Sequence, residues 1–222
     1  MEFRILGPLE VREEGGALRL GGSKQRAVLA SLLLHANEVV SRDRLIDELW
    51  GASPPDTAPT ALQVHVSQLR KALGRDLILT QRPGYLIRVS DGELDLHRFE
   101  QLVARARGEE PALTARLLRE GLALWRGAPL AELGDSFAPA ERARLEEQRL
   151  AAFEQRIEAE LALGRHARSG ARVTRARAAP PGTTARPVDA GPLSLRAPGR
   201  RARGLPFGPA AAGRGARAQA GR

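Results

Sequence analysis

The chain has 222 residues, enough for two small domains, and contains no cysteine, which excludes disulfides and thiolate metal sites. Its first residues lack a basic stretch followed by a long apolar run, and no segment reaches the roughly 20 apolar residues of a membrane span, so we expect a cytoplasmic protein without membrane contact. The formal net charge of +9 does not by itself indicate nucleic-acid binding, because residues 168–222 alone hold 12 basic residues against 1 acidic residue.

The first third of the chain mixes short β-type runs with helical periodicity. Three runs predict strands at residues 3–6, 9–11 and 18–20, with turns at 7–8 and 13–16. Ser23 is the expected cap of a helix over residues 24–36. The apolar face of this helix is predicted to hold Val28, Leu29, Leu32 and Leu33.

Capping residues define two further helices. Ser41 predicts the start of a helix over residues 42–50, with Asp43 near its positive end and Gly51 as its stop. A proline-rich loop at 52–58 follows, and either Thr57 or Thr60 opens a third helix that ends at Leu73. The β-type runs at 77–80 and 85–89 then flank a Pro-Gly turn and predict a hairpin. This order of sheet, three helices and hairpin is typical of a helix-turn-helix carrying a wing.

The third helix has two different faces. At about 100° per residue, the apolar positions that should pack on the domain are Leu62, Val66, Leu69 and Leu73. The opposite face has no acidic residue and presents Thr60, Gln63, Val64, Ser67, Gln68 and Lys71, with His65 and Arg70 on its flanks. The outward groups suit base edges in a major groove, the flanking cations suit phosphates, and Arg82 at the hairpin tip suits a narrow minor groove. A solvated surface explains an isolated polar face equally well, so the prediction of DNA binding depends on helix, hairpin and element order together.

Several motifs occur in a recognisable order. The first two are Arg-Ile-Leu-Gly-Pro-Leu-Glu-Val from residue 4 and Gln-Arg-Ala-Val-Leu-Ala from residue 25. The next two are Leu-Ile-Asp-Glu-Leu-Trp-Gly from residue 45 and Leu-Gln-Val-His-Val-Ser-Gln-Leu-Arg-Lys from residue 62. With Arg-Pro-Gly-Tyr at residues 82–85, they resemble the OmpR-type winged-helix domain and, more closely, the antibiotic regulatory protein (SARP) family of actinobacterial activators.

The resemblance implies an activator of a biosynthetic gene cluster that binds direct repeats in promoter DNA, with a homodimer on DNA as one arrangement. It places the 52–58 loop against RNA polymerase. It also implies DNA contacts for Val64, Ser67, Gln68, Arg70, Lys71 and Arg82. Relatives have arginine at the positions of Ser67 and Gln68, so we expect a different site preference here.

Residues 94–167 resemble the bacterial transcriptional activation domain of the same family, a bundle of tetratricopeptide-like helices. Periodicity predicts apolar stripes on three helices, formed by Phe99, Leu102 and Val103, by Leu118, Leu122 and Trp125, and by Leu145, Leu150, Phe153, Ile157 and Leu161. The expected fold is an α+β winged helix-turn-helix over residues 1–93, followed by an incomplete all-α tetratricopeptide-like domain over 94–167.

The last segment differs in composition. Of the 55 residues in 168–222, 42 are Arg, Ala, Gly or Pro, which predicts a disordered tail. One permitted codon choice for residues 188–200, read one base later, encodes Leu-Thr-Leu-Ala-Leu-Tyr-Arg-Ser-Gly-Arg-Gln-Ala, which is similar to the family's continuation. We therefore hypothesise a frameshift between about Gly164 and Gly170, with the tail as out-of-frame translation. Reading the gene across codons 160–200 tests this.

Two alternatives stay open at this point. One is a truncated, partly folded product that binds DNA without activating transcription, and the other is non-specific nucleic-acid binding through the basic tail. An enzyme is not expected, because Gly21-Gly22-Ser23-Lys24 lacks the spacing of a phosphate-binding loop. The four histidines are too far apart in sequence to suggest a metal site, so we predict no catalytic residue, metal or cofactor.

Overall fold

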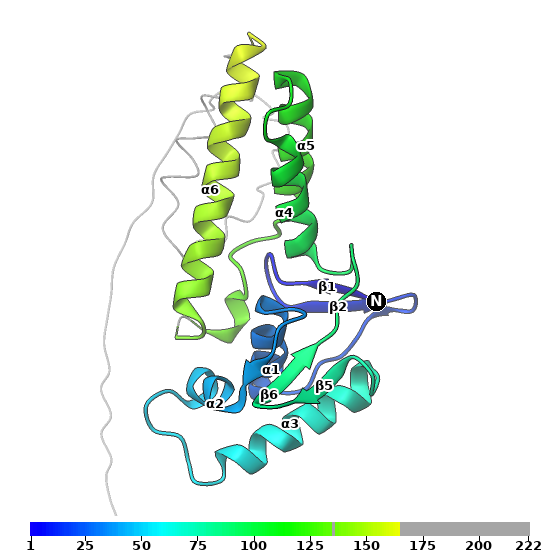
Figure 1. The fold of residues 1–222 in the computed structure, drawn as a ribbon, viewed down its shortest axis with the longest axis vertical. Coiled ribbons are helices and arrows are strands. Elements are labelled where there is room, and N and C mark those ends of the chain that lie inside the picture. Colours follow the sequence, from blue (N-terminus) through cyan, green and yellow to red (C-terminus); the bar gives the residue numbers. More distant parts are fainter. Residues whose placement is uncertain (135, 165–222) are drawn as a thin grey trace, which may run out of the picture. The chain divides into compact units, whose positions relative to one another are not determined.

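The structure is a computed structural model that describes residues 1–134 and 136–164 (Figure 1). The predicted tail at 168–222 and residues 165–170, within which most of the hypothesised frameshift falls, lie outside the described residues. None of the described helices is both long and apolar enough to cross a membrane.

The chain begins with a small antiparallel sheet. Strand β1 (Glu2–Arg4) pairs with β2 (Glu10–Glu13), which pairs with β3 (Gly16–Ala17). The predicted strand at 18–20 is wrong. Glu13 pairs with Gly16 across a two-residue loop, so β3 begins before residue 18. The Leu18 N–H still donates to the Val11 carbonyl (2.8 Å), and the chain then leaves the sheet toward α1.

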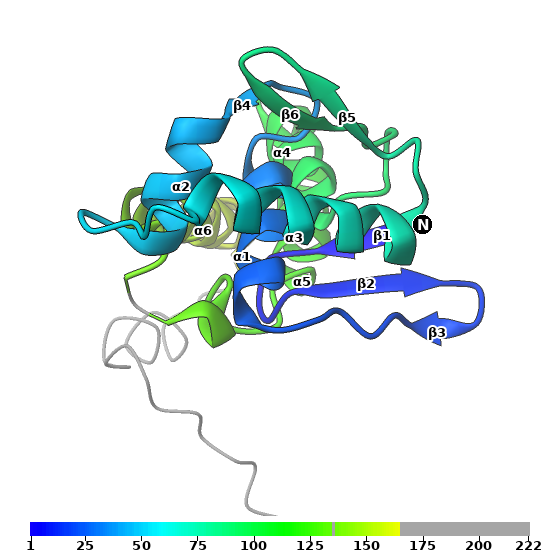
Figure 2. The same ribbon diagram turned by 90° about the horizontal axis from the view of Figure 1, so that it is seen from below.

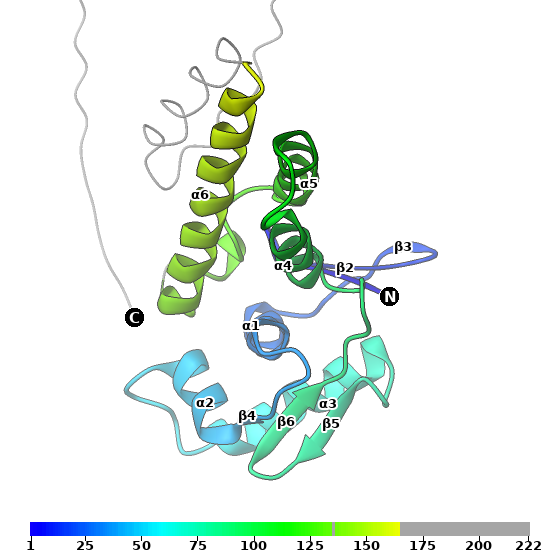
Figure 3. The same ribbon diagram turned by 45° about the horizontal axis from the view of Figure 1, so that its top comes forward.

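Helix α1 (Ser23–Leu34) is the central helix. Gly22 occupies its N-cap without a side-chain hydrogen bond, so the predicted capping by Ser23 is wrong: the helix starts one residue earlier and takes Ser23 into its first turn. The predicted apolar face is buried, but so is every other residue from 27 to 34. The cause is tertiary, since α1 contacts α2, α3 and β6, which lie below it in Figure 3, and its leucines also pack with Phe3 and Leu94 in the same core.

The helix-turn-helix follows the local signals. In α2 (Arg42–Trp50), Ser41 Oγ accepts a hydrogen bond from the backbone N–H of Arg44 (3.1 Å), which confirms the predicted cap. Helix α3 (Ala58–Leu73) ends before Gly74, whose φ of 104° suits glycine. Thr57 precedes α3 but makes no side-chain cap bond, and Ala58 is a buried helical residue rather than part of the loop.

A second sheet carries the wing. Strands β5 (Ile78–Gln81) and β6 (Gly84–Ile87) form the predicted hairpin, and β4 (Val40–Ser41) adds an unpredicted third strand in the order β4-β6-β5. Strand β4 has only two residues, too few for a sequence pattern. It passes so close to Gly84 that a side chain there would overlap the Val40 carbonyl, so glycine is required.

The remaining described elements are helical. They are α4 (Asp95–Ala106), α5 (Pro111–Ala123), a 3-10 turn η1 (Ala131–Leu133) and α6 (Pro139–Ala162). The first predicted stripe is buried apart from a half-buried Val103, and Leu118 and Leu122 of the second are buried as predicted. Trp125 is also buried but lies beyond the end of α5, so its predicted place on the helix is wrong; its ring meets that of Phe99 edge to face with centroids 5.4 Å apart.

The predicted stripe on α6 is partly wrong. Leu145 is fully buried, but Leu150 and Leu161 are 44% and 39% exposed, and Phe153 and Ile157 are half-buried. Helix α6 instead buries small residues among its inward positions, including Ala152 and Ala159.

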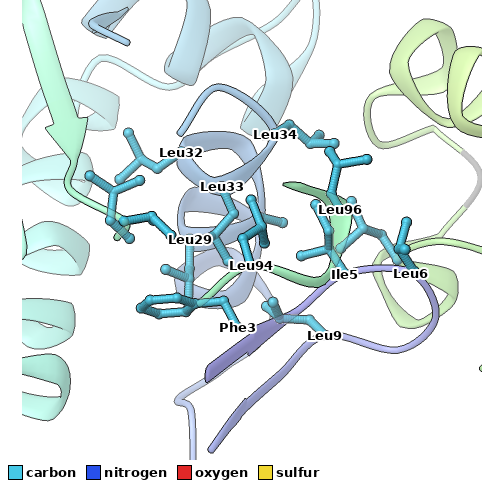
Figure 4. Close-up of a cluster of buried hydrophobic side chains, with 14 of the residues drawn as sticks. Phe3, Ile5, Leu6, Leu9, Leu29, Leu32, Leu33, Leu34, Leu94 and Leu96 are labelled. Atoms are coloured by element: carbon cyan, nitrogen blue, oxygen red, sulfur yellow. The ribbon is translucent and has the colours of Figure 1, made fainter. Parts of the chain in front are cut away.

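The winged helix and the helical segment share one hydrophobic core. Leu94 and Leu96 lie among Phe3, Leu29 and Ile5 in Figure 4, and they belong to one continuous buried cluster. Asp95 fixes this junction, because its carboxylate accepts hydrogen bonds from the backbone N–H groups of Ile5 (2.8 Å) and Leu6 (3.0 Å). Burial raises the pKa of Asp95 above its ordinary value, against the opposing effect of these N–H donors.

Candidate nucleic-acid interface

Helix α3 is fixed to the domain by its apolar face. The four predicted inward residues are all at most 4% exposed: Leu62, Val66, Leu69 and Leu73. They pack against α1 and α2 within the main core. Because a helix buried along one narrow stripe must present the opposite side outward, the orientation of α3 follows directly from its sequence.

The outward face of α3 has the predicted composition. The exposed positions are Thr60, Gln63, Val64, Ser67, Gln68 and Lys71, and Val64 is 48% exposed. Helix α3 contains no aspartate or glutamate. The isopropyl group of Val64 is thus exposed among polar side chains. Such an arrangement suits a surface that contacts bases, because a Val64 methyl can contact the methyl group of thymine. Figure 2, which views the molecule from below, shows α3 lying across the front.

His65 and Arg70, which flank the outward face of α3, are both half-buried and not freely exposed. Arg70 is half-buried, and its Nε donates to the Ile78 carbonyl (2.8 Å) while Nη2 donates to Thr80 Oγ1 (2.8 Å). Arg70 therefore holds strand β5 against α3, a role that helix periodicity does not reveal. His65 is half-buried, and its Nδ1 is buried without a hydrogen-bond partner among the described residues.

The hairpin presents Arg82 at its tip. Gln81 pairs with Gly84, so Arg82 and Pro83 form the two-residue loop, and both are exposed. The peptide bond between them is cis. Because Arg70 joins β5 to α3, the Arg82 loop and the outward helix face belong to one connected structure.

Sequence reasoning missed Arg42. This residue is exposed at the start of α2, its backbone N–H donates to the Pro83 carbonyl (3.4 Å), and its guanidinium carbon lies 5.7 Å from the Tyr85 ring centroid. Arg42 therefore borders the wing loop. Arg42 reaches the wing because β4 pairs with β6, and no local sequence pattern predicts that pairing.

Three exposed cations thus surround the outward surface of α3 and the wing: Arg42, Lys71 and Arg82. Within the part of the chain that the structure describes, none of the three pairs with a carboxylate. Their charges are consequently available to a polyanion.

Two protein families match consecutive parts of the chain. Residues 17–87 match the family described as transcriptional regulatory protein, C terminal. Residues 94–184 match the bacterial transcriptional activator domain, and this match extends beyond residue 167.

Similar proteins are regulators. Regulatory protein DnrI of Streptomyces peucetius is 39% identical over 184 residues, which span 75% of this chain and 67% of the relative. Transcriptional regulator RedD of Streptomyces coelicolor is 36% identical, over 72% of this chain and 49% of that protein. Regulatory protein AfsR of Streptomyces coelicolor is 37% identical over 82% of this chain, but the match spans only 19% of its own length.

A solved structure has the same fold. Mycobacterium tuberculosis EmbR, in complex with a low-affinity phosphopeptide, superimposes with a TM-score of 0.71 at 34% identity. The similarity covers 78% of this chain and 49% of EmbR.

Proposed function

This chain belongs to the antibiotic regulatory protein (SARP) family, and we propose that it binds promoter DNA sequence-specifically through α3 and activates a biosynthetic gene cluster. The family consists of transcriptional regulators and not of enzymes. The observation that carries the proposal is the outward face of α3, which is polar, free of acidic residues and bordered by unpaired cations.

The proposed complex places α3 in the major groove. Gln63 and Gln68 can each form paired hydrogen bonds with an adenine, and Val64 can contact a thymine methyl. Arg42 would contact phosphate beside the groove, and Arg82 would enter the adjacent minor groove, where the negative potential is strongest in narrow tracts. Arg70 is expected to act in part through the position of the wing, given its bonds to β5.

Further partners follow from the family and from the surface. We propose that two copies bind direct repeats, one recognition helix for each repeat. The loop over residues 51–57 is exposed along its whole length and lies just before α3, and we propose it as the contact with RNA polymerase. A sequence-specific contact with DNA would keep this loop at a fixed distance from the promoter.

The test begins with selection of binding sites from a pool of random duplexes, using the full chain. Affinity for the selected duplex is then measured across salt concentrations for two variants. Gln68→Ala is expected to reduce discrimination against a single-mismatch site by about 1–3 kcal/mol. Arg82→Ala is expected to weaken binding and to reduce the salt slope by about 1.

Matched controls come from α4. Gln101 and Arg105 are exposed there and lie outside the proposed interface. Gln101→Ala and Arg105→Ala should therefore leave affinity, discrimination and salt slope unchanged. Selection that yields no preferred sequence, or equal effects from the α3 and α4 variants, contradicts the proposal.

A second candidate function is DNA binding without activation. The observation that favours it is the partly uncovered apolar side of α6, where Leu150 and Leu161 are exposed. Exposed apolar side chains favour self-association, which would withdraw the helical segment from a productive complex with the transcription machinery. Transcription in vitro from a promoter carrying the selected site separates the two: site occupancy with no increase in transcript supports the second candidate.

A further inference from the structure

Three side chains with metal-binding atoms meet where the winged helix contacts α6. His35 follows the end of α1, Glu48 belongs to α2, and Glu141 lies in the first turn of α6. One donor atom from each lies within 4.8 Å of the other two, and all three residues are half-buried. The His35 Nε2 atom is 3.9 Å from Glu141 Oε1.

Two of the donor atoms lack a partner. His35 Nε2 and Glu48 Oε2 are buried, and neither has a hydrogen-bond partner among the described residues. Buried polar atoms of folded proteins are almost always satisfied by protein, water or an ion, and leaving one unsatisfied costs about 1–3 kcal/mol. One ion that binds both nitrogen and carboxylate oxygen could satisfy both atoms at once.

Arg44 orients the two carboxylates. Its Nε donates to Glu48 Oε1 (2.8 Å) and its Nη2 to Glu141 Oε1 (2.5 Å), so each carboxylate is held by a single oxygen. Metal-binding carboxylates commonly have such outer hydrogen bonds, which fix their orientation. The carboxylates of Glu48 and Glu141 outnumber the single positive charge of Arg44, and this excess of negative charge favours a cation.

We propose that His35, Glu48 and Glu141 bind a Zn²⁺ ion, with water in the fourth position. One imidazole and two carboxylates suit Zn²⁺, whereas Mg²⁺ and Ca²⁺ prefer oxygen ligands alone. Ligands at about 2.0–2.2 Å from a tetrahedral ion are roughly 3.3–3.6 Å apart, so donor atoms that lie within 4.8 Å of one another must approach by at most about 1.5 Å. A pocket of about 470 Å³, lined by His35, Glu141 and Arg44, provides access and room for water.

The ion would join parts of the chain that are distant in sequence. Helix α2 is the first helix of the helix-turn-helix, and α6 is the last described helix of the activator segment. Bound Zn²⁺ would therefore add a metal-dependent link between α6 and the DNA-binding half to the hydrophobic core that they already share. The inference does not depend on which DNA sequence is bound.

The experiment uses the full chain, freed of metal with a chelator and titrated with Zn²⁺ by calorimetry. One saturable site per chain is expected, together with a rise in the unfolding temperature. His35→Ala and Glu141→Gln should each weaken Zn²⁺ binding by more than about 10-fold. His97→Ala is the matched control, since His97 lines the same pocket outside the cluster, and it should bind as the parent does. Mg²⁺ at the same concentration should give no saturable heat.

Co²⁺ provides a measurement that needs no variant. Bound to the unaltered chain, it should give the visible absorption of a tetrahedral site and should be displaced by Zn²⁺ in a 1:1 ratio. Absence of saturable Zn²⁺ binding overturns the proposal. Undiminished affinity in His35→Ala also overturns it, because binding would then be adventitious and located elsewhere.

Discussion

Replacing Arg70 with lysine keeps the positive charge beside α3 but removes a paired contact. The guanidinium donates from two nitrogens, to the Ile78 carbonyl and to Thr80 Oγ1, both at 2.8 Å. A single ammonium group cannot reproduce this geometry. Arg70→Lys therefore distinguishes two roles of Arg70. The lysine charge can still contact phosphate, but the paired hydrogen bonds that position the wing are lost.

The expected loss of stability can be worked out from these contacts. A hydrogen bond from a charged donor contributes about 1.5–3 kcal/mol when buried. Arg70 is half-buried and its hydrogen bond to Thr80 is exposed to solvent. Solvent screening therefore reduces the contribution of the two hydrogen bonds to the free energy of unfolding to a total of about 1–2 kcal/mol. For a chain of this size, this corresponds to a fall of roughly 2–8 °C in the unfolding temperature.

The assay compares thermal unfolding and DNA affinity for the parent, Arg70→Lys and Arg70→Ala, with Arg105→Lys on α4 as control. If Arg70 positions the wing, both Arg70 variants lose similar stability, and lysine does not restore DNA affinity. Parental stability and affinity in Arg70→Lys would refute the reasoning and would assign Arg70 to a simple charge contact with phosphate.

Three further predictions concern the framework. Gly84→Ala should cost more than about 3 kcal/mol in urea unfolding, because the added methyl overlaps the Val40 carbonyl; a near-parental midpoint would mean that β4 moves away freely. Asp95→Asn places an amide NH₂ group against backbone donors and should cost roughly 2–4 kcal/mol in the same assay, whereas a neutral result would show that the N–H groups find other acceptors. Leu150→Gln combined with Leu161→Gln should reduce self-association in sedimentation at high concentration without lowering stability; an unchanged sedimentation profile would exclude this side of α6 from association.

Features set by neighbouring residues were predictable from the sequence. Ser41 and Gly51 delimit α2, and a stripe of leucines and one valine determines which side of α3 is buried. A Pro-Gly turn between two β-type runs was sufficient for the hairpin. In each case the physical cause acts within a few residues, so the sequence contains it.

Features set by tertiary packing were not predictable in this way. The apolar residues of α1 suggest one buried face, but neighbouring elements bury every residue of the helix from 27 to 34. Arg42 reaches the wing only because β4 pairs with β6. His35, Glu48 and Glu141 lack any metal-ligand spacing and come together only when α1, α2 and α6 pack. Their relation is not encoded in any short stretch of chain.

The shared core has a practical consequence for anyone who divides or recombines such regulators. A cut after residue 93 would remove Leu94, Asp95 and Leu96, stripping cover from Phe3 and leaving the Ile5 and Leu6 amides without their acceptor. The excised DNA-binding half would then expose hydrophobic surface that is buried in the longer chain. Chimeras between relatives are better joined so that the first strand and the start of α4 come from the same parent.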